Sequence, residues 1–267
     1  MIKDKVCLVI PLYNKEKYIL NTLQSVLKNH GYDNFECIVV DDESTDGSSV
    51  IAQNFCKEHN DKFTYIRIQH KGKRGPSNAR NIGIRLADGD FICFLDADDE
   101  LCEGFIQRAV EAYSEKDIDL YIENVYCCWK PNEPVFNTYK YSGMIVESKQ
   151  WLMDSYFFGN GYYPVFACAM YKTDRVKSIP FKDINAEDFV FLNTHIFYSK
   201  NIYFNTEHFA YQYNICYREQ NTTQQSEYKD DITWFAVATD NIYLLTNCEF
   251  YWRVIWENDT WRIVDNV

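Results

Sequence analysis

Three carboxylates stand within four residues at Asp96-Ala97-Asp98-Asp99, directly after the apolar run FICFL. Carboxylates this close repel one another unless a cation or hydrogen-bond donors compensate their charge. Mg²⁺ and Mn²⁺ suit such a cluster, because hard cations prefer oxygen ligands and usually combine one or two carboxylates with the phosphates of a substrate. The cluster therefore predicts a divalent-metal site for a phosphate-bearing ligand. For Asp99, capping of the helix that follows is an equal alternative.

Alternating strands and helices over the first hundred residues must hold these acids. Four short apolar runs predict buried strands at 6–10, 35–40, 63–68 and 91–95, and apolar residues at helical spacing predict helices at 19–27, 50–56 and 77–86. This order predicts a mostly parallel sheet covered by helices on both faces. Ligands bind such sheets outside the carboxyl ends of the strands, where Asp42, Asp96 and Asp98 fall.

Beyond about Glu103 the alternation loosens. The remaining segments predict a helix at 105–113, strands at 120–126 and 165–171, a helix at 187–198, and a helix-like, aromatic stretch over the last forty residues. Neither an internal repeat nor a linker interrupts the chain. We therefore expect one continuous domain.

The composition excludes several classes of protein. Acidic residues outnumber basic ones by 39 to 27 among the 267 residues, for a net charge of −12, which argues against nucleic-acid binding and against bulk attraction to anionic lipid. An anionic small substrate stays compatible with this charge if the chain supplies local positive groups. With 10 Gly and 6 Pro, collagen-like and linker-rich architectures are excluded.

The cysteines and the apolar runs indicate the compartment. The 10 cysteines include no C-x-x-C pair, so neither a zinc knuckle nor a thioredoxin-type site is predicted, and buried single cysteines imply a reducing environment. The five apolar residues after Lys5 are too few for a signal peptide, and no run is long enough to span a membrane. We expect a cytoplasmic protein. The aromatic, arginine-containing segment 250–264 is compatible with peripheral contact at the cytoplasmic membrane or with a homodimer.

Three blocks of sequence, VIPLYNKEKYI, VVDDESTDGS and SNARNIGIRLADGDFICFLDADDEL, together resemble the nucleotide-sugar half of the family 2 inverting glycosyltransferases. The resemblance covers about residues 6–101 and agrees in order, spacing and placement at strand ends. It implies the α/β GT-A fold, a Rossmann-like fold of nucleotide-diphospho-sugar transferases, with a mostly parallel central sheet flanked by helices and a C-terminal, helical acceptor-binding region. Residues 1–101 would then form the nucleotide-sugar-binding half, and residues 102–267 the acceptor-binding and catalytic half, of one continuous globular domain.

The resemblance also implies roles for residues after the first two strands. Pro11, Tyr13 and Asn14 match the loop that borders the nucleotide. Asp42 matches the aspartate that accepts hydrogen bonds from the base or its ribose. Asp41 is instead expected to be a structural carboxylate at the end of its strand.

In the D-x-D motif Asp96-Ala97-Asp98, the resemblance places Asp96 near the ribose. It assigns Asp98 to a divalent metal, Mn²⁺ or Mg²⁺, that holds the diphosphate. Such a metal offsets the charge that gathers on the leaving diphosphate. Arg80 and Asn81 match an A-R-N signature on the preceding helix, and Arg80 is counted among the donor-binding residues, with a surface ion pair as its alternative.

Two further basic segments are candidates for donor contacts. Lys73 and Arg74 lie in the most basic stretch of the chain, after the third strand, and we expect one of them to face the nucleotide; an ordinary solvated loop is the alternative. Arg218, with Thr222 or Thr223, lies in a polar segment that resembles a late loop of the family tied to the diphosphate.

An inverting transferase needs a base that takes the proton from the attacking hydroxyl. The resemblance assigns this role to an aspartate in an acidic pair well after the D-x-D motif, and Glu187-Asp188 matches it. We expect Asp188 to be the base and Glu187 to support it, whereas an acid favoured by the helix dipole is the alternative. His195 on the same helix is expected to be structural, and His208 is a weaker candidate near the metal.

The sequence therefore predicts a metal-dependent inverting glycosyltransferase that moves a hexosyl or N-acetylhexosaminyl group from a nucleotide-diphosphate donor, UDP-linked by resemblance, to a hydroxyl of a glycan or lipid-linked glycan. The family's roles point to bacterial capsule, O-antigen or lipooligosaccharide synthesis. The alternative is a catalytically inactive partner subunit that binds a nucleotide sugar. A sugar nucleotidyltransferase fits less well because the loop after the first strand, PLYNKEKY, has no Gly, and no P-loop motif is present.

Overall fold

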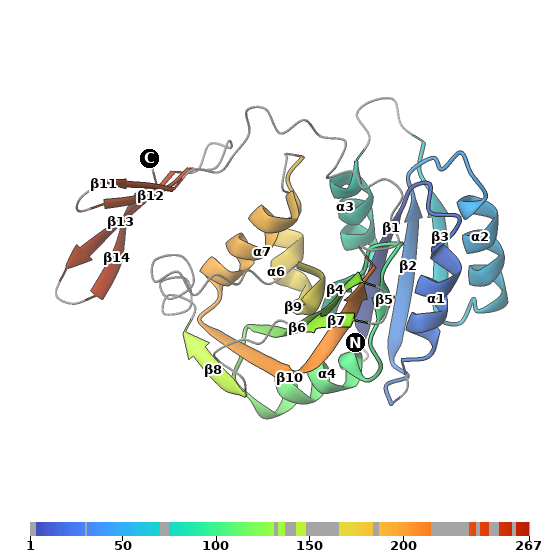
Figure 1. Cartoon of the computed structure of the whole chain (residues 1–267), viewed down its shortest axis with the longest axis horizontal. Coiled ribbons are helices and arrows are strands. Elements are labelled where there is room, and N and C mark those ends of the chain that lie inside the picture. The colour runs from blue at the N-terminus through green and yellow to red at the C-terminus, as the bar shows by residue number, and fades with distance from the viewer. Residues whose placement is uncertain are drawn as a thin grey trace.

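The first strands and helices of the computed structural model follow the order predicted from the sequence (Figure 1). They are β1 Val6–Leu12, α1 Ile19–Leu27, β2 Phe35–Asp41, α2 Ser48–Glu58, β3 Phe63–Arg67, α3 Pro76–Leu86 and β4 Phe91–Phe94, each within two residues of its predicted ends. The structure describes residues 4–29, 31–69, 75–130, 133–136, 143–147, 166–183, 187–214, 235–238, 241–245, 251–257 and 260–266.

The main sheet begins with the strand order β3-β2-β1-β4, so the chain reverses its direction of travel across the sheet after β3. These four strands are parallel. Because crossovers between parallel strands are right-handed, α1 and α2 lie on one face and α3 lies on the other. The reversal point falls between β1 and β4, and open α/β sheets bind ligands at such a point, outside the carboxyl ends of the strands. These ends lie at the upper edge of the sheet in Figure 1.

Beyond β4 the sheet becomes mixed. Its order continues β9-β6-β10-β5; β9 is antiparallel to both β4 and β6, and β6 is parallel to β10. These elements are β5 Glu100–Leu101, α4 Phe105–Glu115, β6 Leu120–Lys130, β7 Glu133–Phe136, β8 Met144–Glu147, η1 Phe166–Cys168, β9 Ala169–Lys172, α6 Thr173–Ser178, α7 Glu187–Tyr198 and β10 Asn201–Tyr213. The prediction of parallel strands thus holds for the first four, and antiparallel β9 joins them to the second half.

A four-stranded antiparallel sheet stands where the sequence predicts a helix-like C-terminal stretch. It comprises β11 Phe235–Ala238, β12 Asn241–Leu245, β13 Tyr251–Glu257 and β14 Thr260–Asn266, in that order. The helical prediction is wrong because Trp, Tyr, Val, Ile and Thr, which favour strands, make up most of β13 and β14. The residues between these two strands, Asn258 and Asp259, are types that favour turns.

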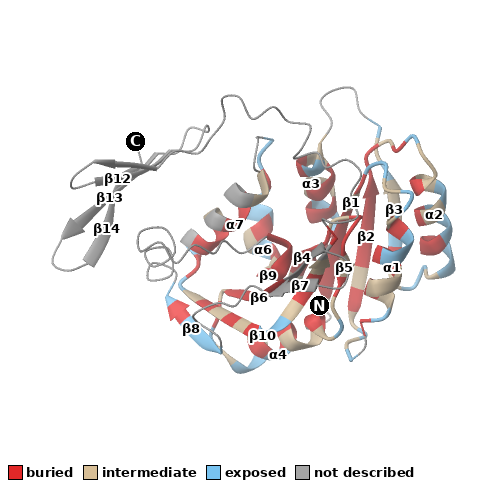
Figure 2. Cartoon of the chain, in the orientation of Figure 1, coloured by how far each residue is buried: buried red, intermediate tan, exposed pale blue. Residues whose placement is uncertain are grey.

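Strand β1 is the centre of the core, which lies on both faces of the main sheet (Figure 2). All residues of β1 except Pro11 are fully buried. Helix α3 approaches β1 closely, because a Cβ added to Gly83 would lie 2.3 Å from a methyl carbon of Val9. Glycine at this position therefore fixes how near α3 sits to the sheet.

Aromatic rings fill the space between β4 and α7. Phe94 of β4 makes edge contacts with Phe181 and Phe191, at centroid distances of 5.2 and 5.5 Å. Phe181 and Phe191 are stacked with parallel rings. This packing explains part of the high aromatic content of the chain, and it holds the start of α7 against the end of β4.

Candidate active site

The loop after β4, residues 96–99, is called the D-A-D loop. Two of its three aspartates, Asp98 and Asp99, are bound by residues of distant elements. Asp98 is only 3% exposed, and its Oδ2 lies 2.7 Å from Nζ of Lys15 in the loop after β1. Asp99 is also buried and accepts a 3.1 Å hydrogen bond from the backbone N–H of Asn214, directly after β10. Asp99 therefore fastens the end of β10 to this loop, and helix α4 has no side-chain cap. Lys15 is a residue that the sequence reasoning missed, although it lies in a basic segment of a strand-end loop.

The third aspartate, Asp96, pairs with Arg80 of α3. Nη2 of Arg80 lies 2.8 Å from Oδ1 of Asp96, and Nη1 lies 2.9 Å from Oε1 of Glu187, the first residue of α7. The Arg80 side chain is 4% exposed, so Arg80 does form ion pairs, as the alternative has it, but they are buried and not at the surface. One buried guanidinium thus joins the D-A-D loop to the start of α7.

Helix α3 also holds the segment that leads to α7. The Asn81 side chain donates to the carbonyl oxygen of Phe181 at 2.8 Å and accepts from its backbone N–H at 2.9 Å. The Ser77 hydroxyl donates to the carbonyl oxygen of Lys182 at 3.0 Å. These bonds, together with the Arg80 bridge, bring the acidic pair at the start of α7 to the same edge of the sheet as the D-A-D loop.

The pKa values of Glu187 and Arg80 reflect both their burial and their ion pair. Burial raises the pKa of Glu187, the Arg80 guanidinium partly offsets this effect, and neighbouring Asp188 adds to it. Burial alone would lower the pKa of Arg80, but Asp96 and Glu187 outweigh burial and raise it. Asp188 is half-buried in the first turn of α7.

The loops after β1 and β2 are tied to each other by Asn14. Its φ of 50° is in the left-handed region, which Asn adopts more readily than most residues. Its backbone N–H donates to Oγ of Ser44 at 3.1 Å, and its Oδ1 accepts from the backbone N–H of Thr45 at 2.8 Å. Asn14 therefore shapes this edge, while neighbouring Tyr13 stays exposed on it.

The two aspartates that end β2 differ in role. Asp41 is fully buried and accepts hydrogen bonds from Ser44 and Tyr65, and although burial opposes ionisation, these bonds lower its pKa. It is the structural carboxylate that the sequence predicts. The Oδ2 of Asp42 accepts a 3.1 Å hydrogen bond from the backbone N–H of Gly75, which directly follows the basic stretch in the sequence. Asp42 thus lies beside the start of α3, because Gly75 is the residue before that helix.

Of the remaining residues predicted to contact the donor, the structure describes Pro11 and Ala97. Pro11 is half-buried in β1, and Ala97 is buried, with its carbonyl oxygen accepting a 3.0 Å hydrogen bond from the hydroxyl of Thr22. Five candidates named from the sequence lie outside the described residues: Lys73, Arg74, Arg218, Thr222 and Thr223.

The two histidines considered from the sequence are both in described elements. His195 is fully buried, with Nε2 3.1 Å from the carbonyl oxygen of Ile179 and its ring against Tyr171 and Phe191. Burial lowers its pKa to about 4, so it is neutral at pH 7 and structural, as predicted. His208 is exposed on β10, within an irregular stretch of its pairing with β6.

The carboxylate oxygens of the D-A-D loop are suitable ligands for Mg²⁺ or Mn²⁺. Asp96 and Asp98 offer carboxylate oxygens from one short loop, and such ions commonly take one or two carboxylates together with phosphate oxygens. The ammonium of Lys15 already pairs with Oδ2 of Asp98, so a cation that binds this oxygen competes with Lys15.

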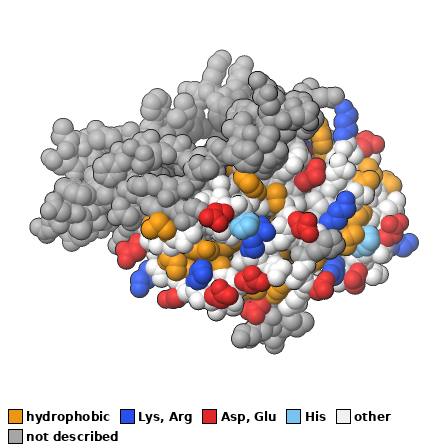
Figure 3. Space-filling view, turned by 60° about the horizontal axis from the view of Figure 1, so that its bottom comes forward, with side chains coloured by type: hydrophobic (Ala, Val, Ile, Leu, Met, Phe, Trp, Pro, Cys, Tyr) orange, Lys and Arg blue, Asp and Glu red, His pale blue; other side chains and the backbone are white. Residues whose placement is uncertain are grey.

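Another group of potential metal ligands lies at the opposite edge of the sheet. Cys7, Glu36 and Asp88 place their ligand atoms within 4.8 Å of one another. The ammonium of Lys5 pairs with both carboxylates there, at 2.8 Å from Glu36. This edge is the one turned toward the viewer in Figure 3, where acidic and basic side chains of described residues are interspersed.

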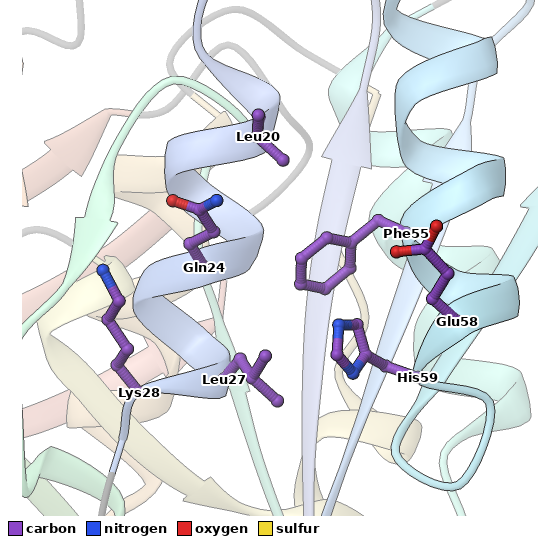
Figure 4. Close-up of a pocket in the computed structure, with 7 residues that line it drawn as sticks. All are labelled: Leu20, Gln24, Leu27, Lys28, Phe55, Glu58 and His59. Atoms are coloured by element: carbon purple, nitrogen blue, oxygen red, sulfur yellow. The ribbon is translucent and has the colours of Figure 1, made fainter.

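A cavity of about 370 Å³ opens between α1 and α2 (Figure 4). The described residues that line it are Leu20, Gln24, Leu27, Lys28, Phe55, Glu58 and His59. None of them is a site residue predicted from the sequence. The candidate active site is therefore the acid-lined edge and not this cavity.

Comparison with known proteins identifies the family. The model of a family described as glycosyl transferase family 2 matches residues 7–179, more than half of the chain and including the D-A-D loop, α3 and β9. The chain belongs to glycosyl transferase family 2. The resemblance carried by the three sequence blocks is thereby confirmed.

Two curated relatives of this family 2 chain come from bacteria. It is 36% identical over 124 residues to the glycosyltransferase GlyG of Streptococcus pneumoniae, covering 46% of this chain and 40% of GlyG. It is 31% identical over 115 residues to the minor teichoic acid biosynthesis protein GgaB of Bacillus subtilis, covering 42% of this chain and 12% of GgaB. The chain therefore spans less than half the length of either relative.

Solved structures confirm the fold of the family 2 chain. Staphylococcus aureus TarS 1-349 in complex with UDP-GlcNAc has a TM-score of 0.69 at 24% identity, covering 83% of this chain and 61% of that one. The mannosyltransferase PcManGT of Pyrobaculum calidifontis, in complex with GDP-Man and Mn²⁺, has a TM-score of 0.57 at 18% identity, covering 80% and 58%. The α/β GT-A fold predicted from the sequence is confirmed. Within the described ranges, no helix is long and apolar enough to cross a membrane.

Proposed function

We propose that this family 2 chain is an inverting, metal-dependent glycosyltransferase that moves a sugar from a UDP-linked donor to a hydroxyl of a bacterial surface glycan or its lipid-linked precursor. The observation that carries the proposal is the Arg80 bridge between Asp96 and Glu187. It joins the acids at the end of β4 to the acidic pair of α7, although Asp96 and Glu187 are 91 positions apart in the sequence. Donor-binding and proton-accepting groups at one sheet edge are what a transfer reaction needs.

The nucleoside would bind at the reversal point of the sheet. Asp42 and Asp96 offer carboxylate oxygens that accept hydrogen bonds from the base or the ribose hydroxyls. Exposed Tyr13, in the loop after β1, offers an aromatic face on which the base can stack. The TarS neighbour, whose structure contains UDP-GlcNAc, supports the choice of UDP.

The diphosphate would bind beside the D-A-D loop. Asp98 would hold Mn²⁺ or Mg²⁺, and when bound this ion offsets the negative charge that gathers on the leaving diphosphate. If the metal takes the place of Lys15 at Asp98, the Lys15 ammonium stays in the loop after β1 as a positive charge near the diphosphate. Lys73, Arg74 and Arg218 are proposed to add positive charge around the same group.

The chemical step is a single displacement at the anomeric carbon. Asp188 takes the proton from the acceptor hydroxyl while the hydroxyl oxygen forms its bond to the anomeric carbon. The bond from that carbon to the diphosphate oxygen breaks, and its electron pair leaves with the diphosphate. Attack from the side opposite the leaving group inverts the configuration. Glu187, held by Arg80, supports the position of Asp188 at the start of α7.

Names of relatives support the choice of acceptor. GgaB is a minor teichoic acid biosynthesis protein. Another relative, 33% identical over 114 residues, is a Campylobacter jejuni glucosyltransferase acting on a glycan linked to undecaprenyl diphosphate, and the chain spans 36% of it. Both names favour a surface glycan or its lipid-linked precursor as the acceptor.

Thermal unfolding with nucleotides tests the donor and the metal together. UDP, GDP, CDP and dTDP are each added with and without Mn²⁺ to wild type, Asp98→Ala and the control Asp33→Ala, which removes an exposed acid far from the D-A-D loop. At about 100 times Kd, a ligand specific for the folded state raises Tm by about 5–10 °C. We expect this rise with UDP and Mn²⁺ in wild type and Asp33→Ala, and its loss in Asp98→Ala. No rise with any nucleotide would contradict the proposal.

Replacing the proposed base separates the enzyme from an inactive binding subunit. We expect Asp188→Asn to lower transfer, or slow hydrolysis of UDP-sugar, by about 10²–10⁴-fold, the usual contribution of a general base. The UDP-dependent rise in Tm should persist, because Asp188 does not bind the nucleotide. Wild type that binds UDP without any turnover would favour the inactive subunit instead.

A further inference from the structure

Arg80 is a buried cation that serves two partly exposed carboxylates. The rings of Phe166 and Phe181 lie 4.4 and 5.1 Å from its guanidinium carbon. Its Nη2 donates to Asp96 and its Nη1 donates to Glu187, whose side chains are 31% and 19% exposed. The protein covers the guanidinium, whereas both carboxylates reach the surface of the site. A ligand at this edge would meet the carboxylates and not Arg80.

The two carboxylates belong to different halves of the domain. Asp96 follows β4, and Glu187 begins α7, beyond antiparallel β9. The helix that carries Arg80 also binds residues 181 and 182 through Asn81 and Ser77. The guanidinium is therefore the charged part of a continuous contact between the halves.

We propose that Arg80 is a positioning residue that couples donor binding at Asp96 to the acidic pair at the start of α7, without touching the donor. This inference rests on the proposed function, because it takes Asp96 as a donor contact and Asp188 as the base. Asp96 and Glu187 share one guanidinium, so a change in the charge or contacts of either carboxylate alters the hydrogen bond that Arg80 makes to the other. Such coupling between two sites is reciprocal.

Reciprocity gives a direct test, because neutralising Glu187 must change donor affinity. In Glu187→Gln, Arg80 has Asp96 as its only carboxylate partner in this bridge and binds it more strongly. Asp96 then becomes a poorer acceptor for the donor. We expect UDP, in the presence of Mn²⁺, to bind Glu187→Gln about tenfold more weakly than wild type, the effect of redirecting one charge-assisted hydrogen bond.

The bridge itself is tested in a second background. Lysine keeps the charge but presents one ammonium in place of a planar fork, so Arg80→Lys cannot hold both carboxylates in the same way. Calorimetric titration with UDP and Mn²⁺ compares wild type, Glu187→Gln, Arg80→Lys and the double variant. We expect Glu187→Gln to have no further effect on UDP affinity once Arg80 is Lys.

A matched control comes from the second buried pair of this kind. Arg108 lies 2.7 Å from fully buried Glu123, on α4 and β6, outside the candidate site. Arg108→Lys is expected to lower Tm while leaving UDP affinity within about twofold of wild type. If Arg80→Lys does not fold, Asp96→Asn replaces it, because removing the other end of the bridge must also remove the effect of Glu187→Gln.

Each outcome decides between coupling and its absence. Equal UDP affinity in wild type and Glu187→Gln overturns the coupling, and so does an equal loss in both Arg80 backgrounds; the proposed function survives either result. If wild type fails to bind UDP with Mn²⁺, the UDP-dependent function and the coupling fall together.

Discussion

The carboxyl ends of β1, β2 and β4, with the loops that follow them, form what we call the donor edge. Basic side chains of the protein itself balance the charge of the acids there. Lys15 neutralises Asp98, and Arg80 serves both Asp96 and Glu187. A buried carboxylate without a partner is costly, so an acidic protein must place its few cations at such points. The net charge of −12 is therefore a poor guide to the local potential of this edge.

Removing the ammonium beside Asp98 tests this balance. We expect Lys15→Met to bind Mn²⁺ about tenfold more tightly in the absence of nucleotide, because the cation no longer competes with Lys15 for the carboxylate. Electron paramagnetic resonance of free Mn²⁺ measures the affinity. Lys62→Met, which breaks an ion pair with exposed Asp33, serves as the control and should leave the affinity unchanged. Equal affinity in Lys15→Met and wild type would show that Lys15 does not compete.

Buried His195 gives a dependence of stability on pH. Its pKa of about 4 lies below the ordinary value of 6.5, so the unfolded chain binds the proton first as pH falls. The stability that neutral His195 contributes is complete above about pH 6.5 and is lost progressively toward pH 4. Between pH 7 and pH 5 the loss is about 2 kcal/mol.

The variant His195→Leu isolates this effect. It should be less stable than wild type at pH 7, because the carbonyl oxygen of Ile179 loses its partner. The difference between the two proteins should shrink by about 2 kcal/mol at pH 5, since only wild type carries the histidine. Urea unfolding at both pH values measures it. An unchanged difference would mean that His195 is not held neutral.

At the scale of elements, the approach of α3 to β1 determines where Arg80 lies. In an ordinary helix Gly→Ala is stabilising, but a Cβ at Gly83 would lie 2.3 Å from Val9. We expect Gly83→Ala to lower the free energy of unfolding by about 1–3 kcal/mol, as overpacking does. Denaturant unfolding measures the loss, and Val9→Ala in the same chain should relieve part of it. A stabilised Gly83→Ala would show that α3 can move away at little cost.

The elements around the site were predictable where their signals are local. Strands β1 to β4 are short apolar runs that end near polar residues or proline. Their approximate bounds and the acids after them therefore follow from the sequence. The structural roles expected for Asp41 at the end of its strand and for His195 without an acidic or cysteine partner at ligand spacing also rest on nearby sequence. Such assignments need no knowledge of which distant elements meet.

The contacts that complete the site were not predictable, because they join residues far apart in the chain. No spacing links Lys15 to Asp98, or Asn214 to Asp99. The C-terminal strands were missed for a different reason. Aromatic and β-branched residues fit a buried helix as well as a strand when their periodicity is weak, and only strand pairing decides between the two.

At the scale of the whole molecule, the fold buries most of the thiols whose side chains the structure describes. Of the cysteines with described side chains, Cys7, Cys37, Cys56, Cys93 and Cys168 are buried and Cys102 is half-buried. Burial raises the pKa of Cys56 to about 12 and that of Cys37 well above its ordinary value. Thiols held in this form are poor nucleophiles. The five buried cysteines are part of the hydrophobic core.

Alkylation measures how completely the fold protects them. We expect iodoacetamide at pH 8 to modify Cys37, Cys56 and Cys93 at least about 100-fold more slowly in the native protein than in guanidinium chloride, because modification requires unfolding. Peptide mass spectrometry follows each site. Modification of Cys93 at similar rates under both conditions would show that β4 opens without global unfolding.

The Arg80 bridge also has a consequence for the order of events during synthesis. Arg80 and Glu187 are 107 positions apart. At about 5–20 residues per second, a ribosome delivers the acid roughly 5–20 s after the arginine. In that interval β1 to β4 can pair, but for most of it the emerging chain lacks Phe166 and Phe181, and for all of it the chain lacks Glu187. The nascent first half therefore presents a guanidinium to solvent or to chaperones, and the donor edge takes its final form only when β9 and α7 have left the ribosome and docked.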